Sequence, residues 1–147
     1  MEPKDRFDAY MKLSDFRVHR WDARREFEIK VSVALWALLA ATAAVLKVRP
    51  DSVLLAALLL IVVAGHALFF LVPIWTSNKL DIETAFCYAE MAERELSSSI
   101  QVRPKPAALR GWSSWKGAAS DWGVRFQILT TTILALGVWL LAGHISS

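Results

Sequence analysis

Three stretches without a single Asp, Glu, Lys or Arg constrain what this chain can fold into. They cover residues 31–46, 52–78 and 126–147 of a chain of 147 residues. A helix needs about 20 predominantly apolar residues to cross the hydrocarbon layer of a bilayer. The second and third stretches exceed that length, and Lys47 and Arg49 can extend the first by directing their charges to the membrane surface. We therefore predict an all-α integral membrane protein with three transmembrane helices.

Charged residues make up 21% of the chain and are concentrated before and between these stretches. This segregation separates blocks that face lipid from blocks that face water. We predict an N-terminal cytoplasmic amphipathic helix, three transmembrane helices, and a cytoplasmic region that combines a helical extension, a linker and a Trp-rich interfacial segment. The expected bounds are 1–30 for the amphipathic helix, 31–49, 52–78 and 126–145 for the transmembrane helices, and 79–125 for the cytoplasmic region.

The basic residues near the membrane ends predict the orientation of the chain. They gather before the first span and between the second and third spans, at Arg20, Arg24, Arg25, Lys30, Lys79, Arg110, Lys116 and Arg125. Because Lys and Arg favour the cytoplasmic side, we expect a multi-pass protein of the inner (cytoplasmic) membrane, with its N-terminus inside and its C-terminus outside. A signal peptide is not expected, since a long charged segment comes first. The net charge of +3 is balanced within each block, so we expect no nucleic-acid partner.

Two amphipathic stripes predict how the water-facing blocks pack. One stripe consists of Phe7, Met11, Ser14, Val18 and Trp21, and the other of Ile82, Phe86, Ala89, Ala92 and Leu96. Their three- and four-residue steps are typical of helices. We expect both helices to continue into the adjacent spans and to pack on each other, with Pro73 as a candidate kink. A membrane-surface anchor is the alternative use of the first stripe, and self-association would compensate for so small a core.

His66 is the one titratable residue deep inside a predicted span. Intramembrane ionisable residues are candidates for function, so a pore or proton role is open. A structural hydrogen bond to another helix is the alternative, and haem or metal ligation is a third. Haem would want a second axial ligand, and His19 and His144 lie at opposite faces of the membrane. We predict no cofactor and no metal site.

Small and hydroxylated residues mark two further sets of candidates. Thr130, Thr131 and Thr132 could line a wet path between helices or bond back to their own helix. Ala37, Ala41 and Ala44 form a small face that permits close helix packing in lipid, with Ala40 among them. Thr131, Ala135 and Ala142 form a second small face.

Three tryptophans, Trp112, Trp115 and Trp122, crowd the approach to the third span. Trp prefers the headgroup level, so we predict interfacial anchors. A cofactor or quinone pocket built by the indoles is the alternative.

No catalytic set is visible: Cys87 has no His close in sequence, Glu90 and Glu93 are expected on a solvated face, and Gly-rich phosphate loops and metal-ligand spacings are lacking. We predict that the protein is not an enzyme. Its single cysteine allows no internal disulfide.

The junction at residues 21–30, WDARREFEIK, leads directly into Ala34, Leu35 and Trp36. A charged helix that runs into two spans and then a cytoplasmic helix resembles the small multi-span, SLATT-like membrane effectors of bacterial defence systems. The likeness covers the architecture of the first 96 residues, and the third span is additional to it. The resemblance implies a self-associating pore-forming or membrane-disrupting effector, active in antiphage defence and silent until a regulatory partner or signal acts. The alternative is a non-catalytic accessory subunit of a larger membrane complex.

Overall fold

The computed structural model describes residues 2–45, 52–97, 100–106 and 112–144. In these segments every regular element is a helix, which confirms the all-α class for the described part of the chain. The elements are α1 (Pro3–Val45), α2 (Ser52–Gly65), η1 (His66–Leu71), α3 (Val72–Leu96), α4 (Trp112–Ser120) and α5 (Trp122–His144). The expected turn at 46–51 and the C-terminal residues 145–147 lie outside the described residues.

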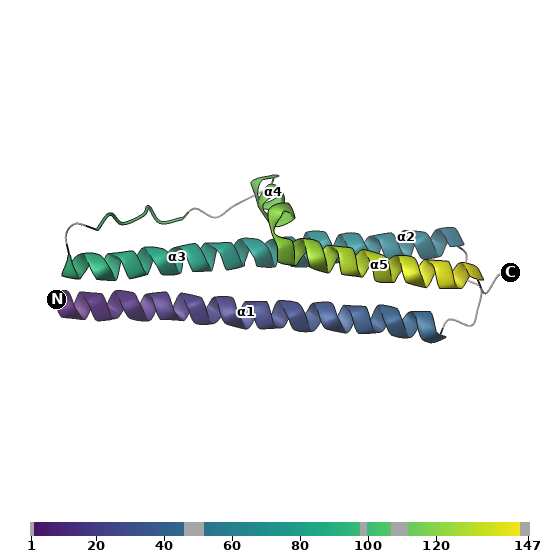
Figure 1. Cartoon of the computed structure of the whole chain (residues 1–147), viewed down its shortest axis with the longest axis horizontal. Coiled ribbons are helices and arrows are strands. Elements are labelled where there is room, and N and C mark those ends of the chain that lie inside the picture. Colours follow the sequence, from purple (N-terminus) through teal and green to yellow (C-terminus); the bar gives the residue numbers. More distant parts are fainter. Residues whose placement is uncertain (1, 46–51, 98–99, 107–111, 145–147) are drawn as a thin grey trace.

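The fold is a long antiparallel hairpin to which α5 adds a third helix along part of its length (Figure 1). One arm is α1, whose 43 residues extend for about 65 Å at 1.5 Å per residue. The other arm is the continuous run of α2, η1 and α3. Both predicted continuations are therefore confirmed at the level of the helices: the N-terminal helix runs into the first apolar stretch, and the second apolar stretch runs into the helix that follows.

Three of the helical runs are long and apolar enough to cross a membrane, by length and composition: residues 3–44, 53–96 and 122–142. Their apolar parts lie side by side in the half of the hairpin that α5 joins, which we call the three-helix half (Figure 1). The other half, formed by residues 3–24 of α1 and 79–96 of α3, has no third helix beside it among the described residues and is called the two-helix half. The prediction of three helices that are long and apolar enough to span a membrane is therefore confirmed.

A π-helical turn, η1, precedes Pro73. Proline has no backbone N–H, so a continuous α-helical ladder cannot be maintained across it. The N–H of Val72 instead donates to the carbonyl of Ala67, five residues earlier. This wider turn places His66 and Leu71 together on the buried face, and such turns occur often at functional sites. Pro73 thus coincides with a local change of helix type.

The short helix α4 lies across the bundle where the two halves meet (Figure 1). Its Ala118 is buried in an apolar core with Leu71, Val72 and Val124. Gly117 faces the indole of Trp75, and a Cβ at that position would lie only 2.1 Å from the Trp75 ring. Glycine is therefore required for this close approach.

The stripe predicted for the N-terminal helix is confirmed, because each of its five members is buried or half-buried. The stripe predicted for α3 is partly wrong. Phe86 is 52% exposed and Leu96 is also exposed, whereas Asp81 and Thr84 are buried. The helix is rotated because three arginines of α1 surround the Asp81 carboxylate. A charged partner therefore overrides the apolar pattern at this position.

Candidate functional site: a buried polar network in the three-helix half

His66 lies at the start of η1 and joins the helices of the three-helix half. Its ring is buried. The Nε2 atom lies 3.1 Å from the hydroxyl of Ser32 on α1, and Nδ1 lies 3.0 Å from the hydroxyl of Thr131 on α5. The ring of Phe70 stacks on the imidazole with 5.6 Å between centroids. The structure therefore places the candidate His66 in contact with the candidate Thr131.

The network continues from Ser32 to a buried carboxylate. The Ser32 hydroxyl donates to Oε1 of Gln127, and Nε2 of Gln127 donates to Oε1 of Glu28. Glu28 is only 2% exposed, although an isolated buried charge is costly. Its second oxygen lies 3.4 Å from Nη1 of Arg25 and 3.4 Å from Nδ2 of Asn78. The carboxylate is thus compensated by one guanidinium group and two side-chain amides.

Thr131 ends the network on the other side of His66. Its hydroxyl oxygen accepts a hydrogen bond of 2.9 Å from the indole of Trp36. The same hydroxyl lies 2.8 Å from the backbone carbonyl of Gln127. Thr131 is completely buried, and Ala135 and Ala142 are buried with it, so the second small face predicted from the sequence is the side of α5 that packs inside the bundle.

Asn78 is the member of the network whose hydrogen bonds are incomplete. Its side chain is buried, and its amide donates to Glu28. Its Oδ1 atom has no hydrogen-bond partner. A buried acceptor of this kind weakens the site unless water reaches it.

The two other candidate threonines are separate from this network. The hydroxyl of Thr130 donates to the carbonyl of Phe126 at 2.9 Å, and that of Thr132 donates to the carbonyl of Ile128 at 2.8 Å. Both therefore adopt the back-bonded arrangement that is usual for threonine in helices. Of the three predicted hydroxyls, the structure brings only Thr131 to His66.

The predicted packing residues and anchors are found on different surfaces. Ala37, Ala41 and Ala44 are exposed, so within one chain they contact no neighbouring helix closely. Trp115 packs beside the core at Ala118, whereas Trp122 is largely exposed. The side chain of Trp112 lies outside the described part of the structure.

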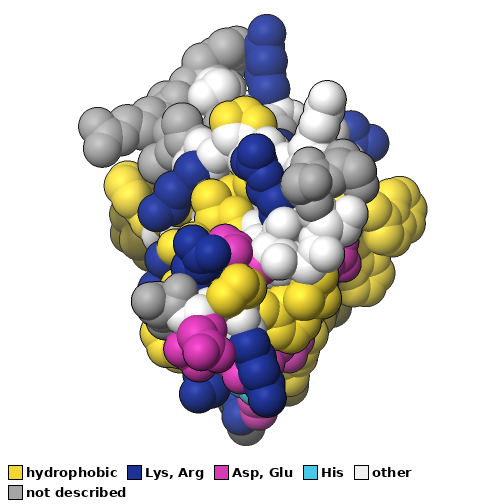
Figure 2. Space-filling view, turned by 90° about the vertical axis from the view of Figure 1, so that its left-hand side faces the viewer, with side chains coloured by type: hydrophobic (Ala, Val, Ile, Leu, Met, Phe, Trp, Pro, Cys, Tyr) yellow, Lys and Arg dark blue, Asp and Glu magenta, His cyan; other side chains and the backbone are white. Residues whose placement is uncertain are grey.

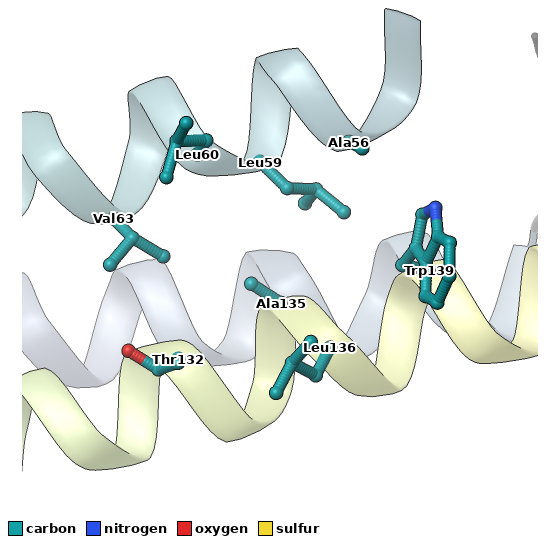
Figure 3. Close-up of a pocket in the computed structure, with 8 residues that line it drawn as sticks. All are labelled: Ala56, Leu59, Leu60, Val63, Thr132, Ala135, Leu136 and Trp139. Carbon is teal, nitrogen blue, oxygen red and sulfur yellow. The ribbon is translucent and has the colours of Figure 1, made fainter. Parts of the chain in front are cut away.

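An apolar groove of about 320 Å³ separates α2 from α5. Side chains from the two helices face each other across it (Figure 3). The residues that line it are Ala56, Leu59, Leu60, Val63, Thr132, Ala135, Leu136 and Trp139. Because the Thr132 hydroxyl is bonded to its own helix, the lining is almost entirely apolar and suits a hydrocarbon chain.

A second buried carboxylate, Asp81, lies in the hairpin near the junction of the two halves. Arg17 contacts it at 2.8 Å, Arg20 lies 3.8 Å away, and Arg24 binds the other oxygen together with Arg20. Burial, followed by the positive charges of Arg20 and Arg17, lowers the pKa of Arg24 from its usual value. One carboxylate thus holds three guanidinium groups on one face of α1.

The expectation for the acidic residues of α3 is partly wrong. Glu90 does not lie on a freely solvated face, because it accepts a 2.9 Å hydrogen bond from the backbone N–H of Arg103 and pairs with the Arg103 side chain. Cys87 is buried, and its thiol contacts the carbonyl of Arg103. Glu90 and Cys87 together hold segment 100–106 against α3.

Sequence reasoning missed Glu28, Ser32, Asn78 and Gln127. A signal for two of them was present: the stripe that ends at Trp21 reaches Glu28 and Ser32 when its three- and four-residue steps continue. Gln127 is the only side-chain amide in the third apolar stretch and lies four residues before Thr131. Within the described residues there is no group of three or more His, Cys, Asp or Glu that could hold a metal ion.

Comparison of the chain with protein-family models, with curated proteins and with solved structures found no match. The function is therefore inferred from the geometry.

Proposed function

We propose that the protein is a self-associating membrane effector that acts on the bilayer as an assembly. We place it in the cytoplasmic membrane with the two-helix half in the cytoplasm, on the basis of the Lys and Arg distribution. A reporter active only outside the cytoplasm should be active after Ser147 and silent at Arg103. The reverse result would invert the orientation.

The observation that carries this proposal is a face of α1 whose side chains stay exposed from Leu13 to Ala44. Only Arg20, which reaches Asp81, and Phe27, which lies beside the ring of Phe70, are shown with ion-pair or ring contacts to other elements of the described chain. Along this face, exposed residues follow each other in alternating steps of three and four, the spacing of a helix–helix seam. We call them the α1 seam: Leu13, Phe16, Arg20, Ala23, Phe27, Lys30, Ala34, Ala37, Ala41 and Ala44. The predicted packing residues Ala37, Ala41 and Ala44 are the membrane end of this seam.

In the two-helix half, the seam carries exposed apolar side chains that indicate an interaction surface. Leu13 is 43% exposed and Phe16 is 55% exposed, in the region without a third helix. Viewed from the end that holds the N-terminus, apolar side chains are exposed among interspersed basic and acidic ones (Figure 2). Two helices bury too little surface to be stable alone, and exposed apolar patches commonly mark interaction sites. A second copy would cover the patch.

The two charged members of the seam already have partners within their own chain. The guanidinium of Arg20 lies 3.8 Å from the Asp81 carboxylate, and Lys30 pairs with Glu26 at 2.6 Å. Both charges therefore enter a contact between copies partly neutralised. The membrane part of the seam consists of alanines, which allow two backbones to approach closely.

The mode of action is constrained by where polar groups lie. The network around His66 is closed inside one chain, so a path for ions would have to run between copies. The exposed membrane face of α1 presents Val33, Leu38 and the seam alanines, which are apolar. These features favour a membrane-disrupting assembly over a water-lined pore.

Cysteine crosslinking tests the association. In a Cys87→Ser background, Ala23→Cys lies on the seam and should form covalent dimers with a short bis-maleimide in intact membranes. Asp15→Cys is exposed on the same helix but off the seam, and it is the matched control. Equal crosslinking at both positions, or none at Ala23→Cys, would contradict the proposal.

Dye release tests the action on the bilayer. Vesicles that contain the wild-type protein should leak, and Ala41→Leu should reduce leakage by separating the helices at the seam. The defence role implied by the resemblance is tested separately by phage plating on cells with and without the protein. Failure of that assay alone would leave the membrane action intact and remove the biological assignment.

An accessory subunit is the second candidate, because the same exposed seam could bind a different membrane protein. A wild-type chain that is monomeric when purified alone, but stable in the presence of other chains, would favour this alternative.

A further inference from the structure

The hydrogen-bond directions in the buried network can be assigned from its fixed end, Glu28. A carboxylate only accepts hydrogen bonds, so Nε2 of Gln127 must be the donor to Glu28. This orientation turns Oε1 of Gln127 toward Ser32, and the Ser32 hydroxyl donates its proton there. The order of donors is thereby set from Glu28 to Ser32.

The donor and acceptor roles of the Ser32 hydroxyl also determine the tautomer of His66. Because the single proton of the Ser32 hydroxyl is used toward Gln127, Ser32 can only accept from Nε2 of His66, 3.1 Å away. Nε2 therefore carries a hydrogen. A neutral imidazole has one N–H, so Nδ1 is the free acceptor and faces the hydroxyl of Thr131 at 3.0 Å.

Thr131 makes a second proton on His66 possible without loss of a hydrogen bond. Its oxygen accepts from Trp36, and its own proton has two acceptors in reach, Nδ1 of His66 at 3.0 Å and the carbonyl of Gln127 at 2.8 Å. When His66 is neutral, the hydroxyl donates to Nδ1. When Nδ1 is protonated, the hydroxyl rotates to the carbonyl and accepts the new N–H.

We propose that this network is a proton-binding site within the bundle, in which Nδ1 of His66 takes the proton and the Glu28 carboxylate supplies the counter-charge. One N–H bond forms while one O–H bond of a hydronium ion breaks and releases water, and no other covalent bond changes. The site is independent of the proposed self-association, since every member belongs to one chain.

Two features of the surroundings of His66 can stabilise a cation against the cost of its burial: the nearby carboxylate and a stacked aromatic ring. From α1, the charged groups of the network are the Glu28 carboxylate and Arg25, whose side chain is 39% exposed. From α5 and α3, the network members Gln127, Thr131 and Asn78 are neutral. The stacked ring of Phe70 on η1 offers an aromatic face, which attracts cations.

Because of the Gln127 amide, the network can bind a proton but cannot conduct one. It lies between Ser32 and Glu28, and an amide does not exchange protons as a hydroxyl or an imidazole does. Glu28 therefore acts on His66 through its charge and does not receive the proton. The site holds a proton and does not form a wire across the membrane.

Nitrogen NMR of the full chain in lipid nanodiscs, with ¹⁵N-labelled histidine, tests the assignment. His19→Gln and His144→Gln identify the two other histidines. We expect His66 to show the Nε2–H tautomer at high pH and to become doubly protonated as the pH is lowered. An Nδ1–H tautomer at high pH, or a ring that stays neutral down to about pH 4, well below the usual range of histidine, would overturn the proposal.

Variants test the role of the counter-charge. In Glu28→Gln, the cationic fraction of His66 at a given pH should fall by about threefold or more, as expected on removal of an opposite charge. Glu26→Gln is the control, because Glu26 lies on the same helix with its side chain 68% exposed, and it should have no effect. An unchanged cationic fraction in Glu28→Gln would overturn the role of Glu28.

Thr131→Val provides a second test if Glu28→Gln does not fold. It removes the acceptor for the new N–H, so the cationic fraction should fall as well, while Thr130→Val should match the wild type. Equal titration of His66 in Thr131→Val and the wild type would exclude the hydroxyl from the proton site.

Discussion

The hydroxyl oxygen of Thr131 lies 3.0 Å from Nδ1 of His66, although 65 residues separate the two in the chain. Each member of this pair also bonds to α1, His66 through Ser32 and Thr131 through Trp36. A single buried contact therefore fixes η1, α5 and α1 relative to one another. In a bilayer, where apolar side chains gain little by leaving lipid, such bonds help to determine which helix faces meet.

Thr131→Val should destabilise the bundle by about 1–2 kcal/mol, the upper range for hydrogen bonds between membrane helices. The substitution leaves the indole N–H of Trp36 and one ring nitrogen of His66 without a partner. Thr130→Val serves as the control, since its hydroxyl bonds only to its own helix. Unfolding by SDS titration, followed by circular dichroism, measures both. Equal stabilities of the two variants would show that the Thr131 contact carries no free energy.

Asp81→Asn should lower the free energy of unfolding by about 2 kcal/mol, because three guanidinium groups lose their shared carboxylate. The loss is smaller than for a fully buried pair, since the arginines keep contact with water. Glu83→Gln is the matched control on the same helix, where Lys79 and Glu83 form an exposed pair at 3.8 Å. A loss as small as that of Glu83→Gln would mean that the arginines are stable without Asp81.

Gly117→Ala should displace α4 from the bundle, because the new methyl group would overlap the indole of Trp75. Overpacking of this kind costs about 1–3 kcal/mol. Tryptophan emission should shift to longer wavelength as Trp75 and Trp115 become hydrated. Gly137→Ala has open space around its Cβ and should leave the spectrum unchanged. An unshifted spectrum in Gly117→Ala would contradict the tight contact.

Acidification should release segment 100–106 from α3. The backbone N–H of Arg103, together with its guanidinium, lowers the pKa of Glu90 from its usual value of 4.5. The stabilisation is therefore complete above pH 4.5 and is lost as the pH falls through the lowered pKa. Hydrogen exchange of the Arg103 amide, corrected for its intrinsic rate, should show less protection at low pH. In Glu90→Gln that dependence should be absent, and its persistence would assign the effect to another group.

The three long apolar helices could be predicted from the sequence because the pattern that defines them is local. Charge-free length identifies each apolar stretch, and the absence of Gly and Pro around the junctions predicts that α1 and α3 continue beyond these stretches. The orientation of α3 could not be predicted in this way. Its apolar residues suggest a face through Phe86, but Asp81 faces inward because partners more than 50 residues away, Arg17 and Arg24, lie opposite it.

The candidate site was half predictable for the same reason. His66 is conspicuous as a titratable group in an apolar stretch, and Thr131 is one of three neighbouring hydroxyls. Glu28 looks like one more charge in a charged segment, and its burial depends on Gln127, 99 residues away in the chain. The continued stripe of α1 indicates only that Glu28 lies on the same face as Trp21, and the tertiary arrangement of α1 and α5 supplies its partner.

Native mass spectrometry of the protein, released from lipid nanodiscs, tests the central claim of self-association most directly. We expect the wild type to yield a defined oligomer, and Ala41→Leu combined with Phe16→Glu to yield monomers that keep the helical content of the wild type. Ala43→Leu and Asp15→Glu, which lie on α1 but off the seam, should leave the oligomer intact when combined. A wild-type chain that is monomeric at every protein-to-lipid ratio would contradict the account.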